Sequence, residues 1–286
     1  MLVYLNGKYL DYTQALLPVD ERGLQFADGI YEVALIWGGQ FVDLDRHLER
    51  FERSAQGIEL PMPLTRSEFR AVADELLRRE PMTQGAIYLQ VTRGVSPRDH
   101  KFPPGSVQPT VIAYLKDAPV DREALQHGVK AITEPDLRWL RCDIKSVSLL
   151  PNVLARQHAV AKGVREAIQV RAGVGVTEGS ATNIWMVHQG SIVTAPASNW
   201  ILSGIVRSVV LELAQQEKLP VAERFASAEE LLQMDEVFMT STTSFVMPIV
   251  EIDGRKVGDG EPGPVTLRLQ ELYLERLDQI THATLG

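Results

Sequence analysis

Lys145 is the first residue of this sequence whose setting suggests chemistry. It lies in the segment 143–149, and in an extended backbone its side chain would share one face with Val147 and Leu149. Lysine is almost never fully buried without a partner. The pattern leaves two interpretations open. The lysine either lies along an apolar sheet edge with its amine in water, or it is a desolvated nucleophile that forms a Schiff base.

Two segments and one arginine are candidates for holding an anion. The segment 202–207 opens an apolar helix, and the free N–H groups at a helix start attract anions. The run 240–244 consists of five hydroxyl residues, which form either a phosphate site or a polar loop. Arg50 lies on an expected helix, on the side opposite its apolar stripe of Leu48, Phe51, Ala55 and Ile58. Periodicity alone therefore favours a solvated position for Arg50.

A cation-rich loop and one acid complete the set of candidates. The loop 93–104 is long and rich in proline, and such loops often carry function. Arg98 and His100 are two residues apart, so in an extended loop they point the same way. That arrangement suits a carboxylate clamp, although a solvated turn gives the same pattern. Glu178 follows the glycine-rich segment 173–177.

Together these residues match what pyridoxal 5'-phosphate requires from a protein. The cofactor needs a lysine for its aldehyde, an acid for its pyridine nitrogen, a phosphate site and a further cation for the substrate carboxylate. Each feature is common by itself, and their joint presence indicates this chemistry. The sequence has no Walker loop, dinucleotide-binding glycine pattern, nucleophile elbow or zinc-ligand spacing. No metal site is expected.

Composition restricts the class of partner and the compartment. A formal net charge of -8 and a pI near 5.4 argue against nucleic acid or an anionic membrane as the main partner. The one cysteine, Cys142, cannot form an internal disulfide, which predicts a reducing, cytoplasmic location. The first residues do not read as a signal peptide, and no apolar run approaches the ~20 residues that span a bilayer.

The length and the order of the expected elements predict two domains. Residues 1–117 read as two strands, two helices and two strands, which is an α+β pattern. Residues 118–121 form the expected linker, and residues 122–286 form a larger C-terminal α/β domain. Local signals predict a hairpin at Asn6-Gly7 and helix N-termini at Asp45, Thr65 and Ser227.

The sequence resembles the fold-type IV pyridoxal-phosphate aminotransferases, and within them the D-amino acid aminotransferases, over nearly all of its length. The lysine and glutamate segments, 143–146 and 177–180, are shared across fold type IV. The arginine–histidine loop, 97–100, indicates the D-specific branch. The further matching segments are 28–32, 45–51 and 241–244.

The resemblance implies a two-domain subunit, a homodimer and an active site between the domains. In that site Lys145 would form the Schiff base with pyridoxal 5'-phosphate and then carry the proton. Glu178 would pair with the pyridine nitrogen, and Arg50 would hold the phosphate. The rest of the implied phosphate site consists of Leu202, the backbone N–H groups of Ile205 and Val206, and the side chains of Ser241 and Thr242.

The resemblance also implies how the substrate is bound. Tyr31, together with Arg98 and His100 from the partner subunit, would hold the α-carboxylate of a D-amino acid. The expected reaction moves an amino group between D-alanine or D-glutamate and pyruvate or 2-oxoglutarate in ping-pong half-reactions. The sequence departs from the family at Val206, where a threonine hydroxyl is common, and at Ala181, where serine is common.

Three other functions are considered. A branched-chain L-amino acid aminotransferase shares the lysine and the glutamate but is not expected to carry the Arg98/His100 pair. An aminodeoxychorismate lyase shares the fold and eliminates pyruvate. A non-catalytic cofactor-binding protein is the fourth interpretation, and the intact Lys145 and Glu178 weigh against it.

Overall fold

The strands of this protein form two sheets, one in each of two compact units. The structure is a computed structural model and describes residues 1–282. Each unit is assembled from separate parts of the chain. Unit 1 consists of Met1–Pro119, Ile144–Ser148 and the stretch that begins at Ile280, and unit 2 consists of Val120–Asp143 and Leu149–Gln279.

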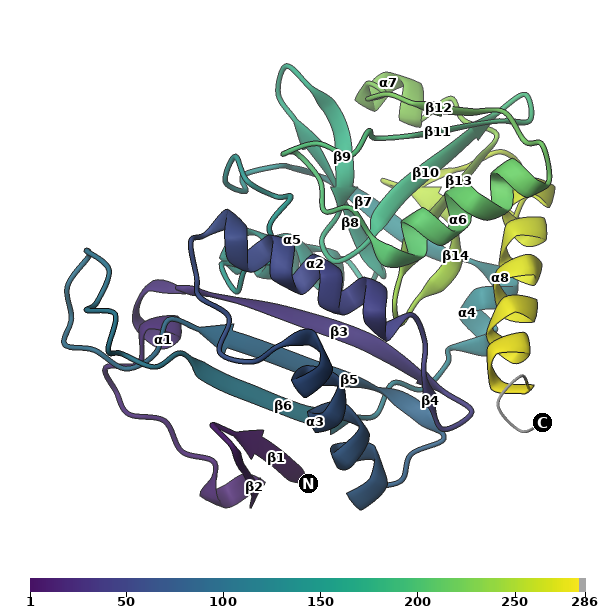
Figure 1. Ribbon diagram of the computed structural model, residues 1–286. Coiled ribbons are helices and arrows are strands. Elements are labelled where there is room, and N and C mark those ends of the chain that lie inside the picture. Colours follow the sequence, from purple (N-terminus) through teal and green to yellow (C-terminus); the bar gives the residue numbers. More distant parts are fainter. Residues whose placement is uncertain (283–286) are drawn as a thin grey trace. The chain divides into compact units, whose positions relative to one another are not determined.

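Unit 1 contains a six-stranded sheet in the order β2-β1-β6-β5-β3-β4, in which every neighbouring pair is antiparallel (Figure 1). The long central strands β3 and β5 pair along nine residues each. The strands are β1 (Leu2–Leu5), β2 (Lys8–Asp11), β3 (Gly29–Trp37), β4 (Gln40–Phe41), β5 (Gln84–Thr92) and β6 (Thr110–Lys116). The helices are the 3-10 helix η1 (Tyr12–Gln14), α1 (Arg22–Phe26), α2 (Leu44–Gly57) and α3 (Arg66–Arg79).

The hairpin predicted at Asn6-Gly7 joins β1 to β2. Both turn residues have positive φ angles, 47° for Asn6 and 87° for Gly7. Asparagine and glycine tolerate this conformation, and the resulting turn matches the twist of the two strands. The prediction is confirmed.

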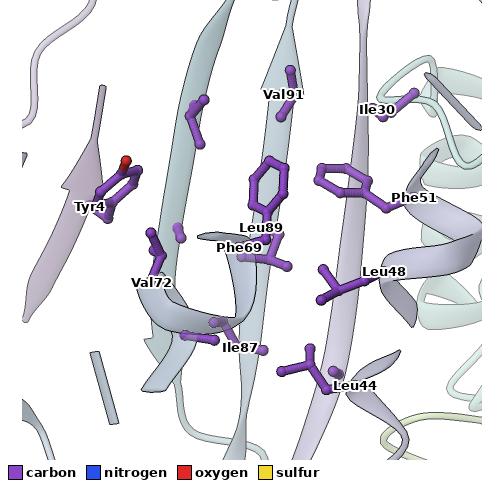
Figure 2. Packing of buried hydrophobic residues seen from close by; sticks show 14 of the residues in the cluster. Tyr4, Ile30, Leu44, Leu48, Phe51, Phe69, Val72, Ile87, Leu89 and Val91 are labelled. Carbon is purple, nitrogen blue, oxygen red and sulfur yellow. The ribbon is translucent and has the colours of Figure 1, made fainter. Parts of the chain in front are cut away.

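Helices α2 and α3 cover one face of this sheet and enclose the core of unit 1. Figure 2 shows Leu48 and Phe51 of α2 and Phe69 of α3 among apolar residues of the strands. The rings of Phe51 and Phe69 meet edge to face at 5.4 Å. The apolar stripe read from the sequence therefore faces the sheet, and Ile58, the C-cap residue of α2, is partly buried and packs against the same core.

Two of the predicted helix N-termini are confirmed, and one is wrong. Thr65 and Ser227 each form a complete capping box, with Glu68 and Glu230. Asp45 does not cap α2, because the helix begins earlier and Asp43 is its N-cap residue. Asp43 has a left-handed backbone (φ 52°), and its side chain caps no backbone N–H group. The side chain of Asp45 instead pairs with Arg70 of α3 at 2.7 Å.

Unit 2 contains a nine-stranded mixed sheet. Eight strands follow the order β12-β11-β10-β13-β14-β7-β8-β9, and β15 pairs with β14. Strands β7 and β8 are parallel, whereas β10, β13 and β14 form antiparallel pairs. The strands are β7 (Val129–Pro135), β8 (Glu166–Arg171), β9 (Gly175–Gly179), β10 (Asn183–His188), β11 (Ser191–Thr194), β12 (Val221–Glu223), β13 (Glu236–Ser241), β14 (Phe245–Ile252) and β15 (Arg255–Lys256).

Helices of unit 2 pack against its sheet. Ala155 and Ala159 of one helix, α5, share a small core with Ile132 of β7 and Ala167 of β8. Tyr273 of another helix, α8, lies 6.0 Å from the ring of Phe245 in β14. The helices are α4 (Arg122–His127), α5 (Leu150–Ala161), α6 (Ile205–Gln216), α7 (Ala228–Leu231) and α8 (Pro264–His282). Over residues 1–282, none of the helices combines the length and the apolar character that crossing a bilayer requires.

Candidate functional site

Lys145 belongs to unit 1 because its segment pairs with the start of β3. The Tyr31 N–H donates to the carbonyl of Lys145 at 2.9 Å, and Ser146 forms a bridge with Ile30. The Lys145 N–H donates to the hydroxyl of Ser54 on α2 at 3.1 Å. These backbone contacts hold the lysine against a sheet and a helix of the same unit.

The segment alternates as expected, but the buried face is the other one. Ile144 and Ser146 are buried, while Lys145, Val147 and Leu149 are only partly buried. The reason is that Ile144 fills part of the core of unit 1. Lys145, Val147 and Leu149 still share one face, and both interpretations of the lysine stay predictions.

The amine of Lys145 lies over an aromatic ring. Its Nζ is 4.4 Å from the centroid of Tyr31, a distance at which a cation is attracted to the ring face. Tyr31 in turn stacks on Tyr88 of β5 at 5.8 Å, and Tyr88 stacks on Tyr114 of β6 at 5.1 Å. Burial raises the pKa of Tyr88, whose hydroxyl donates to Gln90 at 2.6 Å. Tyr31 is thus the end of a row of stacked rings.

Arg50 is buried, not solvated as periodicity alone indicated. Its guanidinium makes two parallel hydrogen bonds to Glu32 of β3, from Nε at 2.7 Å and from Nη2 at 2.9 Å. His47 Nδ1 lies 2.8 Å from the same carboxylate. Burial by itself would raise the pKa of Glu32, but Arg50 and His47 outweigh it, and the pKa is lowered. Burial also lowers the pKa of His47.

Sequence reasoning missed both Glu32 and His47. A usable signal was present in β3, where Glu32 alternates in register with the apolar residues Ile30, Ala34 and Ile36. A charged residue on the buried face of a strand requires a buried partner of opposite charge. Arg50 is that partner.

The side chains of Arg98 and His100, which belong to an exposed loop, both lie against the ring of Phe26. The guanidinium carbon of Arg98 is 4.5 Å from the centroid of Phe26, and the imidazole of His100 is 5.4 Å from the same centroid. Both side chains belong to unit 1. The structure thus places Arg98 beside His100 and Lys145 beside Tyr31.

Unit 2 holds Glu178 in a buried site on β9. Its Oε2 accepts hydrogen bonds from Asn183 Nδ2 and from the Leu202 N–H, both at 3.0 Å, and its Oε1 accepts one from Arg138 Nη1. Burial raises the pKa of Glu178, and the Arg138 guanidinium acts in the opposite direction. All three partners are donors, so they favour the anionic form of the carboxylate.

Arg138 is itself held by a second acid that the sequence reasoning did not identify. Asp136 accepts from Arg138 Nε at 2.9 Å and from Nη2 at 2.8 Å. Arg171 and the hydroxyl of Thr177 also bond to Asp136. Burial opposes ionisation of Asp136, but these donors dominate and lower its pKa. The buried cluster thus contains two acids, Asp136 and Glu178, and two arginines, Arg138 and Arg171.

The start of α6 lies next to this acid within unit 2. Gly204 is the N-cap residue, and no side chain caps the helix. A Cβ at Gly204 would lie 2.1 Å from Asn183 Oδ1, so only glycine fits there without displacing the asparagine. Ile205 and Val206, the first residues of the helix, are buried. An uncapped helix start of this kind suits an anion.

The hydroxyl run forms the turn between β13 and β14. Ser241 ends β13, and its hydroxyl accepts a hydrogen bond from the Ser244 N–H at 3.0 Å. Thr242 is the next residue of the turn and is partly exposed. Both interpretations of this run, a phosphate site and a polar loop, remain compatible with the geometry.

The predicted site residues therefore form two groups. Unit 1 carries Tyr31, Arg50, Arg98, His100 and Lys145, and unit 2 carries Glu178, Leu202, Ile205, Val206, Ser241 and Thr242. Within unit 2, Glu178 is bonded to the backbone of Leu202, which leads into α6.

Sequence comparisons find relatives of known activity. Residues 29–252 match the family described as Amino-transferase class IV. The chain is 44% identical over 269 residues to a D-alanine aminotransferase of Staphylococcus haemolyticus, a match that covers 94% of this chain and 95% of the relative. It is 41% identical over 270 residues to the D-alanine aminotransferase of Bacillus licheniformis, with the same coverage.

Solved structures with the same fold include branched-chain aminotransferases. One from Thermoproteus uzoniensis, determined with norvaline, gives a TM-score of 0.87 at 29% identity and covers 97% of this chain and 94% of its own. A T.th. enzyme, determined with pyridoxamine 5'-phosphate, gives a TM-score of 0.88 at 28% identity and covers 96% of this chain and 93% of its own. These matches confirm the predicted α+β fold class.

The buried pair of Glu32 and Arg50 yields a stability prediction. Replacing Glu32 by glutamine leaves the guanidinium buried opposite a neutral amide, and losing one partner of a buried pair typically costs ~3–5 kcal/mol. We expect Glu32→Gln to lower the free energy of unfolding of the cofactor-free protein by that amount in urea denaturation at pH 7. Glu49→Gln, on the exposed side of α2, is the control and should cost less than about 1 kcal/mol.

The same pair predicts how stability depends on pH. Because the pKa of Glu32 is lowered in the folded protein, its stabilising effect is complete above the ordinary glutamate value of 4.5 and is lost as the pH falls toward the folded-state value. Wild-type stability should therefore fall more steeply below that pH than the stability of Glu32→Gln. Parallel curves of unfolding free energy against pH would contradict the assignment.

Proposed function

The chain belongs to the class IV aminotransferases, and from this premise we propose that it is a pyridoxal 5'-phosphate-dependent D-amino acid aminotransferase. This membership confirms the resemblance recognised in the sequence, and the chain is an aminotransferase. The proposed reaction moves an amino group between D-alanine or D-glutamate and pyruvate or 2-oxoglutarate. The observation that carries the proposal is the 44% identity to a D-alanine aminotransferase over 94% of this chain.

Each of the two groups contains residue types that the proposed cofactor requires. When bound, pyridoxal 5'-phosphate supplies a protonated ring that accepts electrons from the substrate. Glu178, whose three contacts are all with donors, would face the pyridine nitrogen. The uncapped start of α6 would receive the phosphate. Lys145 would hold the cofactor covalently through Nζ.

Several further groups would complete the phosphate site. The backbone N–H groups of Ile205 and Val206 and the hydroxyls of Ser241 and Thr242 supply neutral donors, and Arg50 supplies the cation. Glu32 fixes the plane of the Arg50 guanidinium through two hydrogen bonds, which limits the side-chain freedom that binding would otherwise remove. At position 206 only the backbone can contribute, since valine has no hydroxyl.

Lys145 would also move the proton of the substrate. Its Nζ would take the proton from the α-carbon and return it on the product side, as a positioned general base. The side on which the carboxylate is held decides which enantiomer presents its α-hydrogen to this amine. In our proposal Tyr31, with Arg98 and His100 of the partner subunit, holds the carboxylate on the side that suits D-amino acids.

A homodimer is part of this proposal, because Arg98 and His100 would act across its interface. Both residues are on an exposed loop. Unit 1 also exposes apolar side chains just before and within α1, at 77% for Leu16, 83% for Val19 and 73% for Leu24. Such side chains fit a surface that a second copy covers. We further propose a cytoplasmic location, consistent with a chain that has one cysteine, Cys142.

The second candidate is a branched-chain L-aminotransferase. It is favoured by the similarity to solved branched-chain enzymes at TM-scores of 0.87 and 0.88. Those structures are 28–29% identical to this chain, whereas the D-alanine aminotransferases are 41–44% identical. The sequence relationship therefore favours D-amino acids. An aminodeoxychorismate lyase activity has no comparable support.

The covalent role of Lys145 is directly testable. Borohydride reduction of the cofactor-loaded protein, followed by peptide mapping, should place the cofactor label on Lys145, because its amine lies at the ring of Tyr31 and is not tied into the core. Lys145→Ala should give no label in the same experiment. A label on any other lysine of the wild type would contradict the role.

Glu178→Gln tests the acid at the pyridine nitrogen. The amide keeps the size of the side chain but removes the negative charge that stabilises the protonated ring. We expect cofactor binding to persist and the single-turnover rate with D-alanine to fall roughly 100- to 1,000-fold, as for the loss of one electrostatic stabiliser.

A matched control comes from Glu236, another buried acid of unit 2. Glu236 accepts hydrogen bonds from the N–H groups of Val265 and Thr266 at the start of α8. Glu236→Gln should therefore lower stability and leave the single-turnover rate near the wild-type value. An unchanged rate in Glu178→Gln would remove that residue from the proposed mechanism.

Arg98→Ala tests the handedness of the reaction. Removing one partner of a desolvated charge pair costs ~2–5 kcal/mol, which corresponds to a loss of about 30-fold to several thousand-fold in kcat/KM. We expect this loss for D-alanine and D-glutamate, with cofactor affinity little changed. Lys101→Ala, in the same exposed loop, is the control. The measurement is the half-reaction rate with each enantiomer of alanine, glutamate and leucine. If the wild type prefers the L-enantiomers, the D-specific proposal is wrong and the branched-chain candidate takes its place.

A further inference from the structure

The loop that carries Arg98 and His100 is supported by a cluster of residues outside the proposed site. We infer that Arg22, Phe26, Asp28 and Arg93, here called the Phe26 support, are positioning residues for carboxylate binding. The inference rests on the proposed function, since it assigns to these residues the orientation of the proposed carboxylate clamp. None of the four touches the reacting atoms, so they act through the loop.

One carboxylate joins two buried arginines at the centre of the Phe26 support. Asp28 Oδ2 lies 2.9 Å from Arg22 Nε and 2.9 Å from Arg93 Nε. The two arginine side chains are only 4% and 7% exposed. Two guanidinium groups against one carboxylate leave an excess of N–H donors, which must find other acceptors because buried polar groups are costly when unpaired.

The remaining N–H donors of the two arginines bond to backbone carbonyls, one of them in the loop and two at the end of α2. Arg22 Nη1 donates to the carbonyl of Asp99 at 2.7 Å, and Asp99 is the residue between Arg98 and His100. Arg93 donates to the carbonyls of Ile58 and Glu59 at 2.6 and 2.8 Å, which anchors it to the end of α2. Arg22 therefore holds the loop backbone at the point where its two cationic side chains emerge.

The ring of Phe26 fixes the side chains themselves. The guanidinium carbons of Arg22 and Arg98 lie 4.8 and 4.5 Å from its centroid, and the imidazole of His100 lies 5.4 Å from it. A second ring repeats the arrangement, since the guanidinium carbon of Arg93 is 3.7 Å from the centroid of Phe102. Cations over ring faces are attracted by the ring quadrupole, so Phe26 restricts the rotamers of Arg98.

The N-terminal end of the loop is bonded separately to the rest of unit 1. Glu21 forms a bridge with Val95, the Arg22 N–H donates to the carbonyl of Gly94 at 2.9 Å, and the Arg93 N–H donates to the carbonyl of Asp28 at 3.0 Å. These bonds hold residues 93–95 of the loop. The contacts of Phe26 and Arg22 with residues 98–100 lie beyond them, at the exposed part of the loop that carries Arg98 and His100.

The test replaces the ring and keeps apolar bulk. In the cofactor-loaded full chain, Phe26→Leu should raise KM for D-alanine and D-glutamate about 3- to 30-fold, the range of one to two cation–ring contacts, and leave kcat within about twofold. The ratio of D- to L-alanine turnover should fall as well. Phe26→Tyr, which keeps an aromatic ring at this position, should have the KM of the wild type. A purely structural role would lower the melting temperature without this split between KM and kcat.

Two further variants secure the interpretation. Tyr9→Leu removes another cation–ring contact of unit 1, 4.3 Å from Arg79, and should leave KM unchanged. Phe102→Leu is the second test, because Phe102 is 52% exposed and its replacement spares the core. It should raise KM in the same direction as Phe26→Leu.

The outcomes separate this inference from the proposed function. The inference is overturned if the wild type accepts D-alanine but the Phe26→Leu and Phe102→Leu variants have the same KM and enantiomer ratio as the wild type. That result would leave the proposed function standing. A fall in kcat without a rise in KM also overturns it. A wild type that accepts only L-enantiomers overturns both.

Discussion

The backbone hydrogen bonds between residues 144–148 and the start of β3 decide where the Lys145 amine lies. Lys145 comes just after a stretch of unit 2, Val120–Asp143, yet its carbonyl accepts from the Tyr31 N–H and the Val147 N–H donates to the carbonyl of Gly29. Such bonds depend on backbone geometry and only weakly on side-chain identity. Ile144 secures the segment from the other side by filling the core of unit 1. The amine is therefore carried by a segment that is bonded to the start of β3, and a defined position of this kind is what the proposed catalytic role requires.

The second constraint is charge. Each buried acid of the candidate site is matched to an arginine, Glu32 to Arg50 and Glu178 to Arg138, because an unpaired buried charge would cost several kcal/mol. Lys145 has no such charged partner among the residues that the structure describes. Over residues 1–282 no carboxylate forms an ion pair with it, and its nitrogen lies on the ring of Tyr31. Each acid thus has an arginine of its own, and the Lys145 amine is not held in an ion pair that would compete with the nucleophilic role we propose for it.

The distance along the chain between interacting residues explains which features could be predicted from the sequence. The hairpin at Asn6-Gly7 and the capping boxes at Thr65 and Ser227 depend on residues within four positions of one another, so local patterns suffice. The position of Arg50 depends on Glu32 of another element, and helical periodicity contains no information about it. The same holds for the burial of Ile144 instead of Lys145 and for Arg138 beside Glu178. The roles of the site residues came from family resemblance, since no spacing in the chain encodes them.

Asn183 links Glu178 to the segment before α6 in unit 2, beside the direct bond from the Leu202 N–H to Glu178. Asn183 Nδ2 donates both to Glu178 Oε2 at 3.0 Å and to the carbonyl of Leu202 at 2.9 Å. Its Oδ1 lies so close to Gly204 that any side chain at that position would displace it. The separation between the Glu178 carboxylate and the first turn of α6 is therefore fixed by one residue of β10 together with the Leu202 N–H, which donates to Glu178 directly. A rigid ligand with a ring nitrogen at one end and a phosphate at the other requires a fixed separation of this kind, because its two ends cannot adjust independently.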